Sequence, residues 1–341
     1  MEMPILPGAI DPEAVTAFTR VLDELWPRED RDGPLGLAVS GGPDSLALLL
    51  VAHLALPGEI ASMSIDHGLR AQAQGEVALV ERVCGELGVP FASAALKPAR
   101  GNLQAKAREA RYRALAQWAE KTGLGAVATA HHADDQAETL LMRLARGSGI
   151  AGLAGVRAAT WLPETEIPLV RPLLGFRKAE LESIVAQSGL DPVRDPSNTN
   201  RAFDRVRVRE HLAQHDWLDV EALAASAGHL AEGWRALEWY AELDWEEAVV
   251  LEEEGAPEGP VFRYFVNVPR VTQIETICRI VAALGGHVTR SEAGRAADRL
   301  WRGENASLGG VLGVASVETV AVVGVPMRAW RFRPEPPRRG H

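Results

Sequence analysis

The segment that follows the first apolar run of the chain has the composition of a phosphate-binding loop. It combines two glycines with two hydroxyl side chains and an acid: Ser40, Gly41, Gly42, Pro43, Asp44 and Ser45. The glycines allow a tight turn and close approach of the backbone, and the start of the next helix presents free N–H groups to an anion. The GxxxxGK[ST] pattern of a Walker A loop is absent from the sequence. The alternative is a plain strand–turn–helix connection capped by Asp44.

A second group of reactive side chains lies in AHHADDQAET (130–139). Asp134, Asp135 and Glu138 fall within about one turn of a predicted helix start, so their carboxylates cluster. Opposite a phosphate loop such a cluster can hold Mg²⁺, which prefers oxygen ligands, or the ammonium group of an amine, and both possibilities stay open. Helix capping is the simpler alternative. The two adjacent histidines lack the spacing of zinc ligands.

Two further segments carry polar side chains toward the same region. Asp66 and His67 follow a predicted strand. Arg108 and Arg111 are three residues apart on a predicted helix, so they share a face. Their spacing alone also fits a solvated helix face. Convergence of all these segments on one sheet edge is what favours a functional site.

The first 150 residues alternate short apolar runs with helical patterns. The predicted buried strands are 35–40, 60–65, 91–96 and 125–130, and the predicted helices are 11–26, 44–55, 75–88, 102–121 and 135–146. This order indicates βαβ units: an α/β fold whose parallel sheet carries helices on both faces. Ligands then bind at the carboxyl ends of the strands, where the phosphate loop and the acidic cluster both lie.

The remainder predicts a helical extension and then a smaller helical or α+β domain. Further helices are expected at 177–188, 202–213, 272–284 and 291–302, a helix-like acidic stretch at 238–258, a strand at 261–268 and a hairpin in 308–325. We therefore expect a catalytic domain over 1–215, a second domain over 216–330 and a flexible basic tail over 331–341.

The composition is that of a globular protein, with 341 residues of which 47% are hydrophobic and 24% charged. The net charge of −10 arises largely in 238–258, which carries no Lys or Arg, so it says little about local basic surfaces. Two cysteines, Cys84 and Cys278, favour a reducing compartment and core packing. A signal peptide and a membrane-spanning run are not found in the sequence, so we expect a cytoplasmic protein without a membrane partner.

Taken in order, these motifs resemble the tRNA(Ile)-lysidine synthetases, a family within the PP-loop ATP pyrophosphatases. The matching motifs are SGGPDS (40–45), DHGLR (66–70), ARxxRY (107–112), ATAHHADDQAET (128–139), RGSGIAGLAG (146–155), RPLL (171–174) and DPSNTN (195–200). SGGxDS marks the broad group, whereas the DHGLR, HHxDDQxET and DPSN motifs are more specific. The resemblance is close over 35–215 and weak in the C-terminal third.

The resemblance implies a PP-loop ATPase fold, similar to the adenine nucleotide alpha hydrolases, and a two-step ligation that uses ATP and Mg²⁺. ATP would adenylate the C2 oxygen of the wobble cytidine, position 34, in the isoleucine tRNA with a CAU anticodon, and pyrophosphate would leave. The side-chain amine of L-lysine would then attack C2 and expel AMP, which leaves lysidine. The second domain would hold the tRNA.

Each candidate residue then has an expected role. Residues 40–45 would bind ATP together with Asp66 and His67. Asp44 and Asp134 would hold Mg²⁺, the latter from the acidic cluster.

The remaining candidates would act on charge and protons. Arg108 and Arg111 would stabilise phosphate charge in the transition state. Asp135 and Glu138 would bind the lysine ammonium group and accept its proton.

One position departs from the family pattern. After DPSN the family has Arg-Asn-x-Ile-Arg, whereas this chain has RVRVR (205–209), with Val206 in place of the asparagine. The three arginines could contact tRNA phosphates. Alternatively, Arg207 or Arg209 pairs with Glu210 or Asp204 and only solubilises the helix.

Two other functions compete with this hypothesis. A PP-loop enzyme that thiolates tRNA or amidates a carboxylate would need a cysteine in a motif loop or in a glutaminase site, and neither cysteine lies in such a motif. A non-catalytic adenine-nucleotide-binding module of the electron-transfer type would not need acids opposite the phosphates.

Overall fold

The computed structural model describes residues 10–66, 73–96, 103–193, 204–253, 259–320 and 324–335. The chain divides into two compact units, Met1–Ala231 and Glu232–His341. His67 and the DPSNTN motif (195–200) lie outside the described residues. The described helices are each too short or too polar to cross a membrane.

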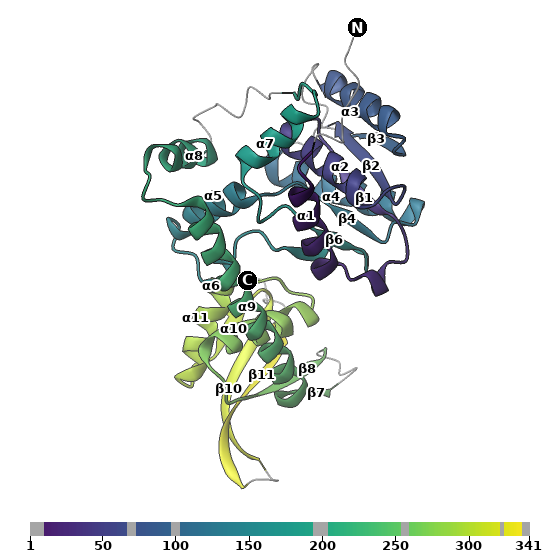
Figure 1. Cartoon of the computed structure of the whole chain (residues 1–341). Coiled ribbons are helices and arrows are strands. Elements are labelled where there is room, and N and C mark those ends of the chain that lie inside the picture. Colours follow the sequence, from purple (N-terminus) through teal and green to yellow (C-terminus); the bar gives the residue numbers. More distant parts are fainter. Residues whose placement is uncertain are drawn as a thin grey trace. The chain divides into compact units, whose positions relative to one another are not determined.

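A six-stranded sheet forms the centre of the first unit (Figure 1). Its strands are β1 (Leu35–Ala38), β2 (Ile60–Asp66), β3 (Phe91–Ala95), β4 (Ala126–Ala128), β5 (Ala159–Trp161) and β6 (Pro168–Val170), in the spatial order β3-β2-β1-β4-β6-β5. All neighbouring pairs are parallel except β5 with β6. The predicted parallel sheet is confirmed, whereas the three-residue strands β5 and β6 are too short to show a pattern in the sequence.

Two cores cover the two faces of this sheet because side chains alternate along each strand. Leu35 and Leu37 point into a core built with α1 (Pro12–Leu25), α2 (Pro43–Ala55), α3 (Ala73–Leu87) and α7 (Lys178–Gln187). Val127 points into the other core, against α4 (Leu103–Thr122). Residues 45–52 of α2 are all buried, which explains why this helix is apolar on every side. Helices on both faces were predicted.

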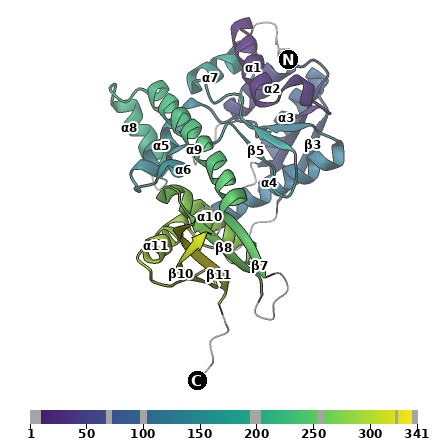
Figure 2. The same ribbon diagram turned by 90° about the horizontal axis from the view of Figure 1, so that it is seen from below.

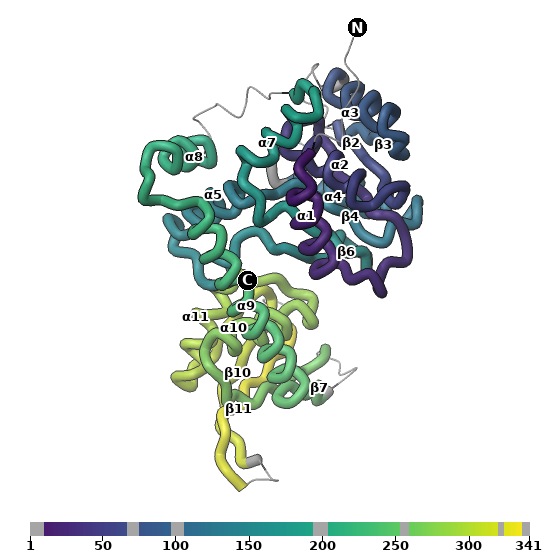
Figure 3. The backbone as a smooth tube through the Cα atoms, in the orientation of Figure 1, coloured from purple at the N-terminus to yellow at the C-terminus, as the bar shows by residue number. Residues whose placement is uncertain are grey.

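The first unit continues through α5 (Ala133–Leu144), α6 (Ile150–Leu153), α8 (Asp204–Gln214) and the start of α9 (Val220–Ala248). Figures 1 and 2 both place α8 beside α5, and these two helices are in contact. The tube in Figure 3 follows the chain by colour from the purple α1 to the green α8. The helices predicted for this unit are found within a few residues of their expected ends, whereas α6 and the start of α9 at Val220 were not predicted.

The second unit is built around an antiparallel sheet. Its strands are β7 (Val249–Glu253), β8 (Val261–Val266), β9 (Ala306–Leu308), β10 (Val311–Val320) and β11 (Val325–Pro334), in the order β7-β8-β11-β10-β9. α10 (Arg270–Ala283) and α11 (Arg290–Trp301) pack against each other and contribute to its core, which also contains Tyr264, Trp330 and Phe332.

Two expectations for this unit are wrong in part. The acidic stretch is helical only to Ala248, because Val249, Val250 and Leu251 continue as a strand. The hairpin is present, but its second strand is β11, so residues 331–334 are not a flexible tail. In this strand Trp330 and Phe332 are buried while the arginines beside them are less so, and this alternation is typical of a strand.

Asp244 gives the second unit a pH dependence. Its buried carboxylate accepts hydrogen bonds from the Tyr264 hydroxyl and Thr276 Oγ1, both at 2.7 Å. Burial raises the pKa of Asp244 above its ordinary value of 3.8, so the folded state resists ionisation and stability is lost as the pH rises through the folded pKa. Asp244→Asn should therefore gain stability over the wild type as the pH rises from 3.8, and this gain should then level off.

Urea unfolding of both proteins between pH 3 and 8 measures this difference. Asp298→Asn provides a control of opposite sign, because hydrogen bonding to Arg270 lowers the pKa of Asp298. A stability difference for Asp244→Asn that is flat or falls with pH would contradict the prediction.

Candidate active site

The phosphate loop connects β1 to α2 and is braced by its own serines. Ser45 Oγ accepts from the Ser40 N–H at 3.1 Å and donates to the Gly42 carbonyl at 3.0 Å. Gly41 has a φ of +85°, and a Cβ there would lie 3.3 Å from the Glu76 carbonyl oxygen, so a glycine is needed. No side chain among the described residues caps the start of α2. Its first N–H groups therefore remain available to an anion.

A cavity of about 300 Å³ opens where this loop meets the start of α5. Strand order reverses between β1 and β4, so two connections diverge at this edge of the sheet. Seven of the residues predicted from the sequence line the cavity: Ser40, Gly42, Asp44, Ser45, Arg108, Arg111 and Asp135. The structure thus brings together three segments that are distant in the chain.

Other candidates lie outside the cavity lining as the structure describes it. Gly41 and Pro43 shape the loop, and Asp66 ends β2. Asp134 and Glu138 lie on α5 but point to other partners.

His132 is the buried centre of the carboxylate cluster, and it was not among the residues predicted to act. Its Nε2 lies 3.6 Å from both Asp44 Oδ2 and Asp135 Oδ2, and its Nδ1 lies 3.7 Å from Asp134 Oδ2. Burial alone would lower the pKa of His132, but the carboxylates around it outweigh burial and raise the pKa to about 10. A protonated imidazole therefore joins the start of α2 to the start of α5.

Asp134 attaches α5 to α7. Its carboxylate accepts from the Lys178 N–H at 2.8 Å and from the Arg177 guanidinium at 3.3 and 3.4 Å. Burial opposes ionisation, yet His132 and these donors together lower the pKa of Asp134. Both oxygens are engaged at the start of α7, which distinguishes Asp134 from Asp44, whose buried Oδ1 accepts no hydrogen bond from any described residue.

Positive charge also gathers at the cavity, which Arg108 and Arg111 line. The guanidinium carbons of Arg108 and Arg111 lie 5.0 and 5.2 Å from the ring centre of Tyr112. Arg171, from the RPLL motif, is buried nearby, and its charge acts on the same tyrosine. Burial opposes ionisation of Tyr112, but the three arginines lower its pKa. The RPLL motif was noted in the sequence, but Arg171 was not predicted to be a charged residue of this site.

His131 is a neutral member of the cavity wall. Its Nδ1 is 2.9 Å from Thr129 Oγ1. Burial, aided by the arginines and opposed by Asp135, lowers the pKa of His131 to about 3. The two adjacent histidines thus carry different charges at neutral pH.

Glu138 is buried against α8. Its Oε1 accepts from Arg209 Nε at 2.7 Å, and its Oε2 is 3.1 Å from Arg205 Nε. Burial outweighs these arginines and raises the pKa of Glu138. Arg207 pairs with Asp204, so the ion-pair interpretation holds for this arginine. Val206 is buried and apolar.

A glycine-rich segment is held by α5 through its backbone. Gln136 donates to the Val156 carbonyl at 2.8 Å and accepts from the Val156 N–H at 2.7 Å. Arg143 donates to the carbonyl groups of Gly152 and Gly155. These hydrogen bonds therefore fix the position of the segment 146–156 relative to α5.

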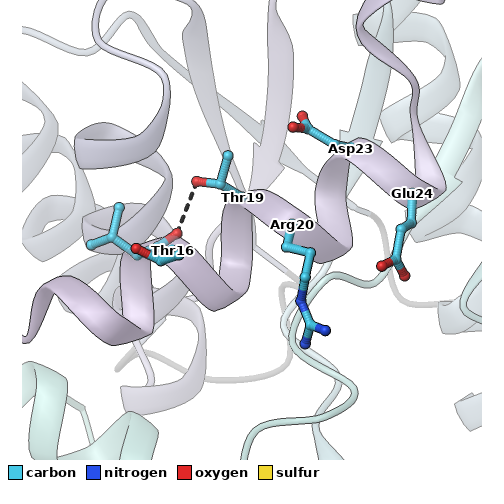
Figure 4. A pocket seen from close by; sticks show the side chains of 6 residues that line it. Thr16, Thr19, Arg20, Asp23 and Glu24 are labelled. Carbon is cyan, nitrogen blue, oxygen red and sulfur yellow. Dashed lines mark hydrogen bonds between the residues drawn. The ribbon is translucent and has the colours of Figure 1, made fainter.

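A larger hollow lies on the surface of α1, but it does not have the character of an active site (Figure 4). Its lining residues all come from this one helix. The hydroxyls of Thr16 and Thr19 donate to carbonyls of their own helix, and Asp23 pairs with Arg28 and Arg31. Its polar groups are largely satisfied by the protein.

In the described part of the chain, no three His, Cys, Asp or Glu side chains form a metal site by themselves. Magnesium is commonly bound by one or two carboxylates together with substrate phosphates. Asp44, with a free buried oxygen beside the phosphate loop, fits this kind of site.

Comparison with known proteins agrees with this geometry. A PP-loop domain model matches residues 14–216. The chain is 44% identical to the tRNA(Ile)-lysidine synthase of Novosphingobium aromaticivorans over 92% of this chain and 93% of that protein. It is 36% identical to the enzyme of the same name from Zymomonas mobilis, over 90% of each chain.

Among solved structures, the U34-tRNA thiolase NcsA from Methanococcus maripaludis is similar with a TM-score of 0.51 and 15% identity. The match covers 66% of this chain and 78% of that protein. At this identity the similarity concerns the fold.

Gly155 tests how tightly α5 holds the glycine-rich segment. Its φ is +66°, and a Cβ would lie 2.2 Å from Gln136 Oε1. Gly155→Ala should destabilise the protein by the backbone cost of about 1–2 kcal/mol, plus the loss of the Gln136 hydrogen bonds.

Gly147→Ala is a matched control, because its φ is +68° but nothing lies within 4 Å of its Cβ position. The free energy of unfolding, measured in urea, should fall further for Gly155→Ala than for Gly147→Ala. Equal losses would show that the Gln136 contact is unimportant.

Proposed function

The chain belongs to the tRNA(Ile)-lysidine synthase family, and from this membership we infer how its site performs the reaction. The protein is a ligase that uses ATP to attach L-lysine to C2 of the wobble cytidine of the isoleucine tRNA, through an adenylated cytidine, with release of AMP and pyrophosphate. We propose that it acts on the tRNA with a CAU anticodon and that Mg²⁺ accompanies ATP. The observation that carries the mechanism is the cavity that combines a phosphate loop with basic and acidic side chains.

The phosphate loop and the arginines would serve the adenylation step. The cytidine C2 oxygen attacks the α-phosphorus, and the bond to the β-phosphate breaks so that pyrophosphate leaves. The N–H groups at the start of α2 and the guanidinium groups of Arg108 and Arg111 stabilise the negative charge that grows on pyrophosphate. Magnesium, when bound, would neutralise further phosphate charge, and Asp44 would hold it.

Asp134 is better suited to positioning than to metal binding. Its oxygens accept hydrogen bonds from Arg177 and Lys178 at the start of α7. We therefore assign the metal role to Asp44, and we assign to Asp134 the orientation of His132 and of α5. Asp66, which ends β2, would contact the nucleotide, and so would His67, the next residue in the sequence.

The acidic side chains of α5 would serve the second step. Asp135 lines the cavity and Glu138 lies one turn later on α5, so both can attract the lysine ammonium group. The amine must lose a proton before it attacks C2 and expels AMP. The raised pKa of Glu138 makes this carboxylate a stronger proton acceptor than an ordinary glutamate.

Contact with the body of the tRNA is assigned to the second unit. On its surface the Arg328 guanidinium lies 3.9 Å above the ring centre of the exposed Trp301. An arginine and an aromatic ring in this arrangement are suited to phosphates and bases. Sulfur transfer gains no support, since Cys84 is buried and neither cysteine lines the cavity.

One assay tests this function directly. The protein is incubated with ATP, Mg²⁺, isotopically labelled L-lysine and the isoleucine tRNA that has a CAU anticodon. Label should enter the tRNA with stoichiometric release of AMP and pyrophosphate, and it should not enter when the tRNA is omitted or its wobble cytidine is replaced. Absence of label in the complete mixture would contradict the proposal.

Asp44 is expected to be essential for adenylation. Asp44→Ala should lower pyrophosphate release by about two orders of magnitude, because the loss of one preorganised charged group costs roughly 3 kcal/mol in the transition state. Asp23→Ala, on α1 and away from the cavity, is the control and should keep wild-type activity. Near-normal pyrophosphate release by a folded Asp44→Ala protein would overturn the assignment.

A further inference from the structure

Arg205 takes part in two neighbouring sites of the first unit. Its side chain lines the cavity together with Asp44 and Arg108. At the same time its Nε lies 3.1 Å from Glu138 Oε2, and its Nη2 donates to Thr139 Oγ1 at 3.1 Å. The Arg205 side chain is 46% exposed, whereas that of Glu138 is 1% exposed. Arg205 thus covers a buried carboxylate from the side of the cavity.

The two oxygens of Glu138 are held differently. Oε1 accepts a short, charge-assisted hydrogen bond from Arg209 at 2.7 Å. Oε2 is buried and accepts no hydrogen bond from the residues that the structure describes, although Arg205 Nε is close. A buried acceptor without a hydrogen-bond donor destabilises the protein. Replacement of Arg205 by a ligand that donates to Oε2 is therefore favourable. A primary ammonium group offers three N–H donors and is such a partner.

Arg205 is also the more exchangeable of the two arginines. Arg209 does not line the cavity, so a ligand there would leave its hydrogen bond in place. Arg205 already reaches the cavity, and a triphosphate carries more negative charge than one carboxylate. A guanidinium group binds phosphate oxygens in a bidentate manner, so a bound nucleotide competes with Glu138 for Arg205.

We propose that Arg205 closes the Glu138 side of the lysine site until a nucleotide binds in the cavity and draws the guanidinium group away. This inference rests on the proposed function, in which Glu138 receives the lysine ammonium group. Without nucleotide, two guanidinium groups repel the incoming ammonium. With nucleotide, Arg209 alone remains on Glu138, and Oε2 accepts from the ligand. The enzyme therefore takes up lysine preferentially after ATP.

Coupling of this kind is reciprocal: lysine must raise the affinity for nucleotide by the same factor as nucleotide raises the affinity for lysine. The experiment uses the full chain without tRNA, so that no adenylation occurs. Calorimetry measures the Kd of L-lysine with and without saturating Mg²⁺ and α,β-methylene-ATP, whose α–β linkage cannot be cleaved. The analogue should lower the lysine Kd of the wild type about tenfold or more.

Arg205→Gln should bind lysine more tightly than the wild type when nucleotide is absent, and its ratio of the two Kd values should be at least about threefold smaller. Direct attraction between ammonium and phosphate persists in this variant, so the change in the ratio is the informative quantity. Arg205→Lys retains a mobile positive charge and should retain most of the ratio. Arg205→Lys therefore distinguishes an effect on the access of lysine to Glu138 from an effect on the packing of α8 against α5.

Arg207→Gln is the matched control, because Arg207 is on the same helix but pairs with Asp204; it should keep the wild-type ratio. Equal lysine Kd values for the wild type with and without analogue, or a wild-type ratio in Arg205→Gln, would overturn the inference. If labelled lysine still enters the tRNA in those cases, the proposed function survives and only the role of Arg205 is lost.

Discussion

Two helix N-termini with acidic side chains meet at the carboxyl edge of the parallel sheet, and one buried imidazolium holds them together. Asp44 at the start of α2 and Asp135 at the start of α5 lie the same distance, 3.6 Å, from His132 Nε2. Without a cation these carboxylates would repel one another in a partly buried place. Removal of one partner from a buried ion cluster typically costs about 3–5 kcal/mol. The geometry of the cavity thus depends on the charge of His132.

The helix α5 also positions the segments that surround the site. Around its circumference, successive polar side chains attach different parts of the chain: Asp134 the start of α7, Gln136 and Arg143 the segment 146–156, and Glu138 the helix α8. Many of these contacts are made to backbone groups of the attached segment. They therefore hold that segment in position whatever side chains it carries. A shift of α5 would therefore move several walls of the site together.

The cavity is lined by both basic and acidic side chains, which suits two substrates of opposite charge. Arg108 and Arg111, with the buried Arg171 near them, create a positive field that complements phosphates. Asp44 and Asp135 line the same cavity, and Glu138 lies one turn beyond Asp135 on α5. The overall charge of −10 gives no hint of these local charges, because local fields act over the Debye length and not over the whole molecule.

The parallel sheet, the phosphate loop and the acidic cluster could all be predicted from the sequence, because each depends on local patterns: apolar runs of strand length, glycines at a turn and acids at a helix start. The same patterns could not show which atoms face the cavity. Asp134, Asp135 and Glu138 look equivalent in the sequence, yet Asp135 lines the cavity while Asp134 binds α7 and Glu138 binds α8. The directions of Asp134 and Glu138 are decided by partners more than 40 residues away, through packing and ion pairs that form only when the chain is folded. The charges of His131 and His132 were settled in the same way, because burial and neighbouring carboxylates set a pKa, and both are properties of the tertiary structure.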